Sequence, residues 1–270
     1  MNPARQFECS IVIPLLAQND RWLEQSIRSA LDQTIRCEVI VVFSDDTPQS
    51  NLDTIHSLAD ANDNLLISRC SPTSFPKGLN IGFFAATSSR VGIVFSDDWL
   101  DPRAVELCLP YDADVVSTGH SFFAADGVTE YPEIRWIPDP IVFAQLPDLE
   151  RKASYLKHFF LFRKSKLNEI GGADEAMGNF PGIDDYDMIW TLLEHHASVA
   201  FVPDSLYLIR DHEADRLTLK GREESVQGLV RILRKHRVED AQMRELIAAH
   251  EQWYGEPVHR VYRRLRGLEK

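Results

Sequence analysis

Residues 91–102 read VGIVFSDDWLDP, an apolar run that stops abruptly at two acids. The run through Ile93, Val94 and Phe95 has no alternating polar residue, which indicates a strand buried on both faces. In an open α/β sheet, ligands bind beyond the carboxyl ends of the strands, which is where Asp97 and Asp98 fall. Adjacent carboxylates repel each other unless a cation lies beside them. The stretch therefore predicts a metal or ligand site, with a simple turn as the alternative because Asp favours strand ends and helix caps.

Composition bounds the kind of protein. The chain has 270 residues and a formal net charge of −12, which fits one large domain or a domain with an appendage and argues against a nucleic-acid partner. The polar N-terminal residues predict no signal peptide, and no apolar run approaches the ~18 residues of a membrane span. The four cysteines are scattered without a CxxC pair, which disfavours a zinc site or a disulfide framework. We expect a protein of the reducing cytoplasm.

Strands and helices alternate in the first hundred residues. Apolar runs predict strands at 9–14, 38–43, 65–67 and 91–95, and helical spacing predicts helices beginning at Asp20, near Leu52 and at Pro76. This alternation is typical of a doubly wound, mostly parallel sheet with helices on both faces. Neither a GxGxxG nor a Walker sequence follows the first strand. Any nucleotide must therefore be held without a glycine-rich phosphate loop.

The second half has a different pattern. Short strands are expected at 114–117, 121–123, 158–163, 199–202 and 206–209, and short helices at 164–170 and from about residue 188. The proline-dotted segment 131–147 predicts a mobile loop over the site. From Gly221 onward the pattern is helical, so we expect a domain over residues 1–220 and a C-terminal helical extension over 221–270.

The end of the second expected strand resembles that of the fourth. Residues 41–46 read VVFSDD and residues 93–98 read IVFSDD. Two parallel strands that both end in acids would form one acidic rim. The flanking sequences do not match, so the similarity indicates strand-end chemistry and not an internal repeat.

Several motifs occur together in the order typical of one family. They are Ser10-Ile11-Val12-Ile13-Pro14, Ser29-Ala30-Leu31-Asp32-Gln33-Thr34, Asn80 with Gly82, Ser96-Asp97-Asp98, Gly171-Gly172-Ala173-Asp174-Glu175, Asp184-Asp185-Tyr186-Asp187 and Tyr207 to His212. Over residues 9–218 the chain resembles glycosyltransferase family 2, with the GT-A fold. The resemblance implies an enzyme that moves a sugar from a UDP-, GDP- or dTDP-sugar to an acceptor hydroxyl, with saccharides and lipid-linked saccharides as acceptors.

The resemblance also implies which residues bind the donor. Pro14, Asn80 and Asp97 fall in matching motifs, and the nucleoside contact falls to Asp45 or Asp46. Two departures stand out. Phe43-Ser44-Asp45-Asp46-Thr47 replaces the family's Val-Asp-Asp-Gly-Ser, and Phe95 replaces the first acid of its Asp-x-Asp-Asp. Lys77 and Arg163 are candidate diphosphate contacts, or else solvated surface charges.

A nucleoside diphosphate leaving group needs its developing charge neutralised. Mg²⁺ or Mn²⁺ held by Asp98, with Asp97 alongside, would act as a Lewis acid. His212 is a candidate further ligand or phosphate contact, with a capped loop histidine as the alternative. Trp99, next to these acids, would stack on a sugar ring or belong to the core.

The acceptor hydroxyl needs a base. Asp185 is the first candidate and Asp184 the rival, because an ionised Asp can accept a proton at pH 7. We expect the neighbouring acids to raise the pKa of Asp185. The alternative is that these acids cap the helix that follows. One base opposite the leaving group, together with the resemblance, implies inversion.

The C-terminal helices are basic and apolar in alternation. Their cations are Arg231, Arg234, Lys235, Arg237, Arg260, Arg263, Arg264 and Arg266. These helices would lie on the anionic inner face of a membrane, form a contact in a homo-oligomer, or pack on the catalytic domain.

Two other functions stay open. A sugar-nucleotide pyrophosphorylase would need a glycine-rich basic loop after the first strand, where Pro14-Leu15-Leu16-Ala17-Gln18 stands. A catalytically silent nucleotide- or carbohydrate-binding module would fit the two departures from the family pattern. Loss of donor hydrolysis in Asp185→Asn with nucleotide binding intact would count against the silent module.

Overall fold

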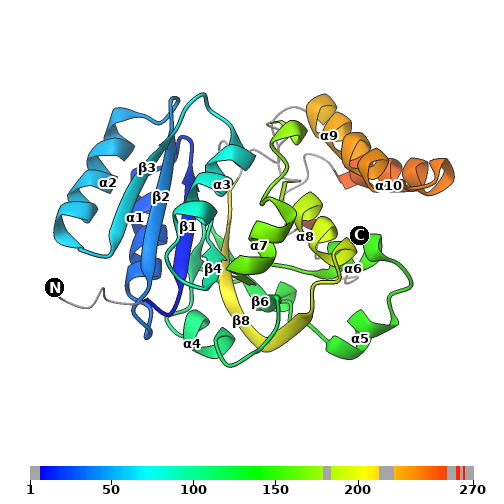
Figure 1. Ribbon diagram of the computed structural model, residues 1–270, viewed down its shortest axis with the longest axis horizontal. Coiled ribbons are helices and arrows are strands. Elements are labelled where there is room, and N and C mark those ends of the chain that lie inside the picture. The colour runs from blue at the N-terminus through cyan, green and yellow to red at the C-terminus, as the bar shows by residue number, and fades with distance from the viewer. Residues whose placement is uncertain (1–6, 179–183, 213–221, 254–259, 262–263, 265–270) are drawn as a thin grey trace.

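The computed structural model describes residues 7–178, 184–212, 222–253, 260–261 and 264. Within them lies one eight-stranded sheet in the order β3-β2-β1-β4-β7-β6-β8-β5 (Figure 1). The strands are β1 Ser10–Leu15, β2 Glu38–Ser44, β3 Leu65–Cys70, β4 Arg90–Ile93, β5 Trp99–Leu100, β6 Val115–Ala124, β7 Phe160–Arg163 and β8 Val199–Asp211. Strands β3, β2, β1 and β4 run parallel, β7 is antiparallel to both of its neighbours, and β6 runs parallel to β8. The α/β fold expected from the alternation is confirmed.

Helices cover both faces of the sheet. They are α1 Asp20–Leu31, α2 Gln49–Ala61, α3 Phe75–Ala85, α4 Ala104–Cys108, α5 Pro140–Gln145, α6 Leu149–Tyr155, α7 Lys164–Ile170, α8 Asp184–Glu194, α9 Arg222–Lys235 and α10 Asp240–Trp253, with 3₁₀ turns η1 Pro132–Ile134 and η2 Glu175–Met177. In the described part of the chain, no helix combines the length and apolarity needed to cross a bilayer.

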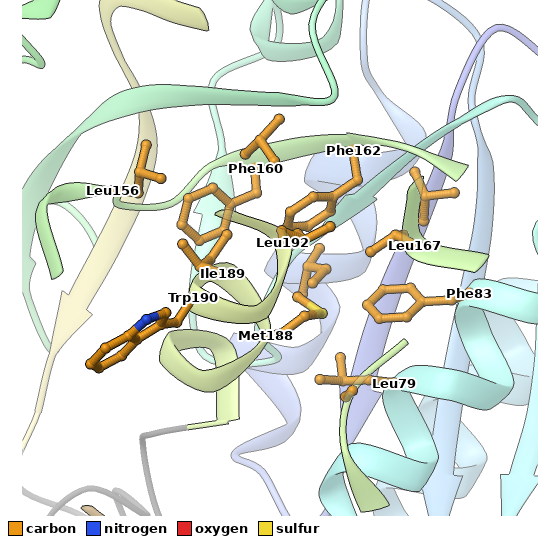
Figure 2. Packing of buried hydrophobic residues seen from close by; sticks show 14 of the residues in the cluster. Leu79, Phe83, Leu156, Phe160, Phe162, Leu167, Met188, Ile189, Trp190 and Leu192 are labelled. Atoms are coloured by element: carbon orange, nitrogen blue, oxygen red, sulfur yellow. The ribbon is translucent and has the colours of Figure 1, made fainter. Parts of the chain in front are cut away.

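Alternate residues of the central strands enter two separate cores. Val12 and Ile40 face α3, α7 and α8, whereas Ile11 and Val39 face α1, α2 and α4. This alternation follows from the two-residue period of a strand, and burial on both faces explains why these strands read as unbroken apolar runs. Figure 2 shows the first core, in which Phe160 and Phe162 of β7 pack between α3, α7 and α8.

Two predictions about the second half are wrong in detail. Segments 114–117 and 121–123 belong to one strand, β6, and segments 199–202 and 206–209 belong to one strand, β8. The register shifts on either side of Gly119, opposite Pro203 and Asp204, so the apolar pattern breaks although the strands continue. Segment 131–147 holds η1 and α5, and Trp136 bridges His120. It is therefore not the structureless loop expected from its prolines.

The C-terminal helices pack against the sheet domain. Leu229, Ile232 and Leu233 of α9 are buried in the same core as Met188 and Trp190 of α8. Residues 213–221, where the expected boundary at 220 falls, lie outside the described residues, and the division into two domains stays a prediction.

The Gly171-Gly172 pair is fixed to α3 by Asn80. The buried Asn80 amide accepts a hydrogen bond from Ala173 N (2.8 Å) and donates to Ala173 O and Glu175 Oε1 (both 2.9 Å). Both glycines have φ of 77°, in the left-handed region that disfavours side chains. A Cβ on Gly172 would lie 2.1 Å from Asn80 Oδ1, whereas one on Gly171 would meet nothing within 4 Å.

Alanine at these two positions should separate strain from collision. We expect Gly171→Ala to lower the free energy of unfolding by ~1–2 kcal/mol, the cost of a left-handed residue. Gly172→Ala should cost a further ~1–3 kcal/mol, because the hydrogen-bonded Asn80 cannot move aside. Urea denaturation measures both changes, and equal losses in the two variants would contradict this account of the loop.

Candidate active site

The Asp98 side chain holds the loop that follows β4 in place through hydrogen bonds to β8. It is buried, and its Oδ1 accepts a hydrogen bond from Arg210 N of β8 (2.9 Å). The Tyr207 hydroxyl bonds the same carboxylate and accepts from Phe95 N (3.1 Å). Burial next to Asp98 raises the pKa of Tyr207 well above its usual value, which keeps the hydroxyl a donor. Asp98 is thus occupied in joining the β4 end to β8.

Asp97 has a different environment. Its side chain is 21% exposed, and its Oδ2 lies 3.2 Å from His212 Nε2. The His212 ring packs on Trp22 of α1 with centroids 4.5 Å apart. Its Nδ1 is buried and has no hydrogen-bond partner among the described residues. The strand-end acid and the residue that follows β8 therefore meet beyond the carboxyl ends of β4 and β8.

The Arg210 side chain connects the segments that surround Asp97 and His212. The side chain is buried between Trp22 and Trp99, with the guanidinium carbon 5.1 and 4.8 Å from their ring centroids. Nε donates to Asp97 O (3.1 Å), Nη1 donates to Ala125 O (3.0 Å), and Nη2 donates to Gln25 Oε1. Burial lowers the pKa of Arg210, an effect opposed by Asp98, Asp97 and Asp126. The guanidinium thus ties α1, β8 and the segment after β6 to the Asp97–Asp98 turn.

Asp97 and His212 could supply some, but not all, of the ligands of a divalent cation. A carboxylate and an imidazole lie together there, and both are groups that bind Mn²⁺ or Mg²⁺. In the part of the chain that the structure describes, no group of three or more His, Cys, Asp or Glu side chains could hold a metal. The donor set therefore fits an ion that takes its other ligands from a substrate.

Asp185 is paired with a histidine that the sequence patterns did not single out. At the start of α8, Asp185 Oδ2 lies 2.9 Å from His158 Nε2. The prediction that neighbouring acids raise its pKa is wrong. Burial acts to raise the pKa of Asp185, but the hydrogen bond and charge of His158, together with Lys157, lower it below its usual value.

The third acid of this segment has a structural role. Asp187 is buried and faces α9, where it pairs with Lys235 Nζ (2.7 Å) and His236 Nε2 (3.0 Å). It is therefore directed away from Asp185. Asp184 is the first residue of α8, and its side chain lies outside the described residues.

A protein-family model matches the chain up to residue 171. The model described as "Glycosyl transferase family 2" matches residues 10–171, more than half of the chain. The chain belongs to glycosyl transferase family 2.

Individual relatives are distant. The O-antigen biosynthesis protein RfbC of Myxococcus xanthus is 24% identical over 235 residues, which cover 84% of this chain and 18% of that protein. The chain thus spans about a fifth of the length of this curated relative. Two solved structures share the fold: S. aureus TarS 1–349 in complex with UDP-GlcNAc, and the mannosyltransferase PcManGT of Pyrobaculum calidifontis in complex with GDP-Man and Mn²⁺. The TarS structure superposes with a TM-score of 0.65 at 17% sequence identity, and the match covers 91% of this chain and 72% of TarS 1–349. The PcManGT structure superposes with a TM-score of 0.61 at 16% identity, and the match covers 93% of this chain and 70% of PcManGT.

In this family 2 chain, Asp45 follows the carboxyl end of β2 and is bound by residues in and just after β3. Asp45 accepts hydrogen bonds from Arg69 Nε (3.0 Å) and Nη2 (2.7 Å) and from Ser71 Oγ (2.8 Å). These contacts, Ser71 first, lower the pKa of Asp45. Lys77 Nζ donates to Ser71 O (2.6 Å), so Lys77 lies beside the same cluster, whereas Asp46 is exposed.

The other residues predicted to contact the donor differ in burial and in whether they already bond other protein groups. Pro14 is buried in β1, paired with Val42. The Asn80 amide is fully used by the Ala173–Glu175 segment, which favours a structural role. Arg163 pairs with Asp112 and Asp114 (3.0 Å), and Trp99 packs on Arg210 and Phe123. Asp45 and Asp46 are exposed and Lys77 is half-buried, so a ligand could reach these three predicted contacts, although Asp45 already bonds Arg69 and Ser71.

Sequence reasoning missed His158, Trp22 and the central role of Arg210. A histidine that opens an apolar strand was the one available signal for His158. Trp22 lies in the helix expected to begin at Asp20, and nothing in the sequence spacing links it to residue 210. Only the fold brings these positions together.

Arg210→Lys should lower the free energy of unfolding even though the positive charge is kept. An ammonium cannot replace the planar fork that stacks between two indoles and reaches three acceptors, and breaking a buried ionic network costs ~3–5 kcal/mol. Arg69→Lys is the matched control, because that arginine is an exposed partner of Asp45 and should cost under ~1 kcal/mol. Urea denaturation measures the free energy of unfolding of both variants. A loss of similar size in Arg210→Lys and Arg69→Lys would contradict the role given to Arg210.

Proposed function

We propose that this family 2 protein is a metal-dependent, inverting glycosyltransferase that moves a sugar from a nucleotide-sugar to an acceptor hydroxyl. The observation that carries the proposal is the pairing of Asp97 with His212 at the sheet edge, with the carboxylate of Asp185 nearby. The two regions are joined by aromatic rings: His158, the partner of Asp185, packs on Phe95 with centroids 4.7 Å apart. Phe95 lies two residues before Asp97.

Asp97 and His212 would hold Mn²⁺ or Mg²⁺. Asp98, expected from the sequence to be the ligand, is instead assigned to the loop, because its carboxylate bonds Arg210 N and the Tyr207 hydroxyl. The bound cation supplies Lewis-acid stabilisation of the leaving diphosphate. The His212 ring packs on Trp22, the Asp97 backbone carbonyl accepts from Arg210 Nε, and the two side chains orient each other through their 3.2 Å contact before substrate binds.

Asp185 would accept the proton of the attacking hydroxyl. Its lowered pKa keeps it ionised at pH 7, and the ring of His158 and the backbone N–H of Tyr186 fix the orientation of its carboxylate. Since no second carboxylate is assigned as a nucleophile, a single in-line displacement with inversion follows. The side chain of Asp184 remains the rival base.

The donor would be a nucleoside diphosphate sugar. TarS binds UDP-GlcNAc and PcManGT binds GDP-Man with Mn²⁺; here Asp45 or Asp46 would contact the nucleoside and Lys77 the phosphates. The likeness to an O-antigen biosynthesis protein favours a saccharide or a lipid-linked saccharide as acceptor. A cytoplasmic position at the inner membrane face is proposed through the basic surface of the C-terminal helices, although Lys235 is engaged by Asp187 and Asp174.

Alanine at the two adjacent acids should have opposite consequences. With UDP, GDP, dTDP and CDP tested with and without Mn²⁺, one nucleotide should raise the melting temperature by mass action in a metal-dependent way. Asp97→Ala should abolish that metal-dependent rise and lower stability by less than Asp98→Ala does, because the Asp97 side chain is 21% exposed and Asp98 is buried. Asp98→Ala should itself lower stability by ~1–3 kcal/mol, because buried donors lose their acceptor.

Two outcomes would refute these assignments. Retention of the metal-dependent rise in Asp97→Ala would remove Asp97 as a ligand. No rise with any nucleotide in the unaltered protein would favour the silent binding module.

Asp185→Asn should leave nucleotide binding intact and lower kcat for transfer by ~10²–10⁴-fold, the usual contribution of a general base. His158→Gln should act differently, by shifting the pH profile. Because His158 lowers the pKa of Asp185, its loss raises that pKa, and the acid limb of kcat should move to higher pH. An unmoved acid limb in His158→Gln would contradict the pairing as a determinant of base strength.

A further inference from the structure

A cavity of about 370 Å³ opens beside Asp185, within the ~300–1,000 Å³ of small-molecule sites. One wall comes from α6, the segment before β7 and α8, and the opposite wall comes from α9 and α10. Figure 1 shows α9 and α10 beyond α8, on the side away from β1–β3. The lining residues are Glu150, Ala153, Ser154, Leu156, Lys157, His158, Phe160, Asp185, Tyr186, Ile189, Leu229, Leu246 and His250.

The cavity is lined by charged groups of both signs. Lys157 faces Asp185, and burial lowers the pKa of Lys157. Glu150 accepts a hydrogen bond from the Tyr186 hydroxyl (2.9 Å), and burial raises the pKa of Glu150. Burial lowers the pKa of His250, which lies 2.9 Å from Ser225 Oγ. Two carboxylates against one ammonium give an anionic ligand no net attraction.

The cavity lining includes both polar and apolar groups. The Tyr186–Glu150 pair and Asp185 present hydroxyl and carboxylate oxygens, while Leu156, Ile189 and Leu246 present methyl groups. A neutral sugar has the matching surface, with hydroxyls at its rim and C–H groups on its faces. An aromatic ring such as Tyr186 is suited to the latter.

The outer wall is fixed in place. Lys235 and His236, at the end of α9, bind Asp187 of α8, and the His236 ring stacks on Trp190 with centroids 4.3 Å apart. His236 Nδ1 also lies 2.8 Å from Glu194 Oε1. The end of α9 is therefore attached to α8 at Asp187, two residues after Asp185.

We propose that this cavity is the acceptor site, that it takes an uncharged saccharide, and that α9 and α10 form its outer wall. The proposal rests on the proposed function, since it gives Asp185 the acceptor hydroxyl. The C-terminal helices then determine acceptor selection in addition to stabilising the domain.

Saturation-transfer NMR with 4-nitrophenyl glycosides tests the proposal. The probes are the neutral glucoside, galactoside, mannoside, rhamnoside and N-acetylglucosaminide, with the anionic glucuronide for comparison, all in the presence of the nucleotide and Mn²⁺ that stabilise the protein. We expect at least one neutral glycoside to bind and the glucuronide not to bind. Leu246→Trp, which fills the cavity from half-buried α10, should weaken that binding about tenfold or more.

Matched variants separate a filled site from a misfolded one. Ser154→Trp fills the cavity from an exposed position on α6 and should have the same effect, whereas Ile141→Trp, on exposed α5 outside the cavity, should have none. All three should keep the nucleotide-dependent rise in melting temperature.

Three results would overturn the proposal: no neutral glycoside binding, preference for the glucuronide, or unchanged binding in both cavity-filling variants. Any of these with the nucleotide-dependent rise intact would sink the acceptor site alone. Loss of that rise in the unaltered protein would instead count against the proposed function.

Discussion

The guanidinium of Arg210 is the interaction on which the site depends. A buried cation is costly unless its hydrogen bonds and charge are met, and here two indole faces, three oxygen acceptors and the nearby Asp97, Asp98 and Asp126 meet them. These partners come from α1, the turn after β4 and the segment after β6. One side chain thus fixes the relative positions of segments far apart in the sequence, and the short Asp97–Asp98 turn gains a rigid support.

Around this support, the acids divide their roles by exposure. Asp98 is inward and completes the backbone bonding of the turn through Arg210 and Tyr207, while Asp97 is outward beside His212. Phe95, where the family pattern has an acid, lies against His158 and Phe75 with centroids 4.7 and 6.0 Å apart. An acid there would face aromatic rings, so the departure from the pattern has a structural counterpart. The same packing positions His158 for its bond to Asp185.

Much of the fold could be predicted because it depends on local pattern. Unbroken apolar runs such as 38–43 marked the parallel strands, and the acids that follow them marked the end of the sheet where the candidate site lies. The long strands β6 and β8 could not be predicted in one piece, since irregular pairing at Gly119 interrupts the two-residue period without ending the strand. Whether Asp97 or Asp98 faces outward also depended on long-range bonds from β8. For Asp185 the sequence showed only neighbouring acids, and the histidine that reverses the pKa shift lies 27 residues away.

An anomalous-scattering map from a crystal grown with Mn²⁺ and the stabilising nucleoside diphosphate tests the central claim most directly. The account predicts one manganese peak bonded to the Asp97 carboxylate and the His212 imidazole, with diphosphate oxygens completing its shell and Asp98 still bonded to Arg210 N. A peak bonded to Asp98, or one at neither Asp97 nor His212, would contradict it.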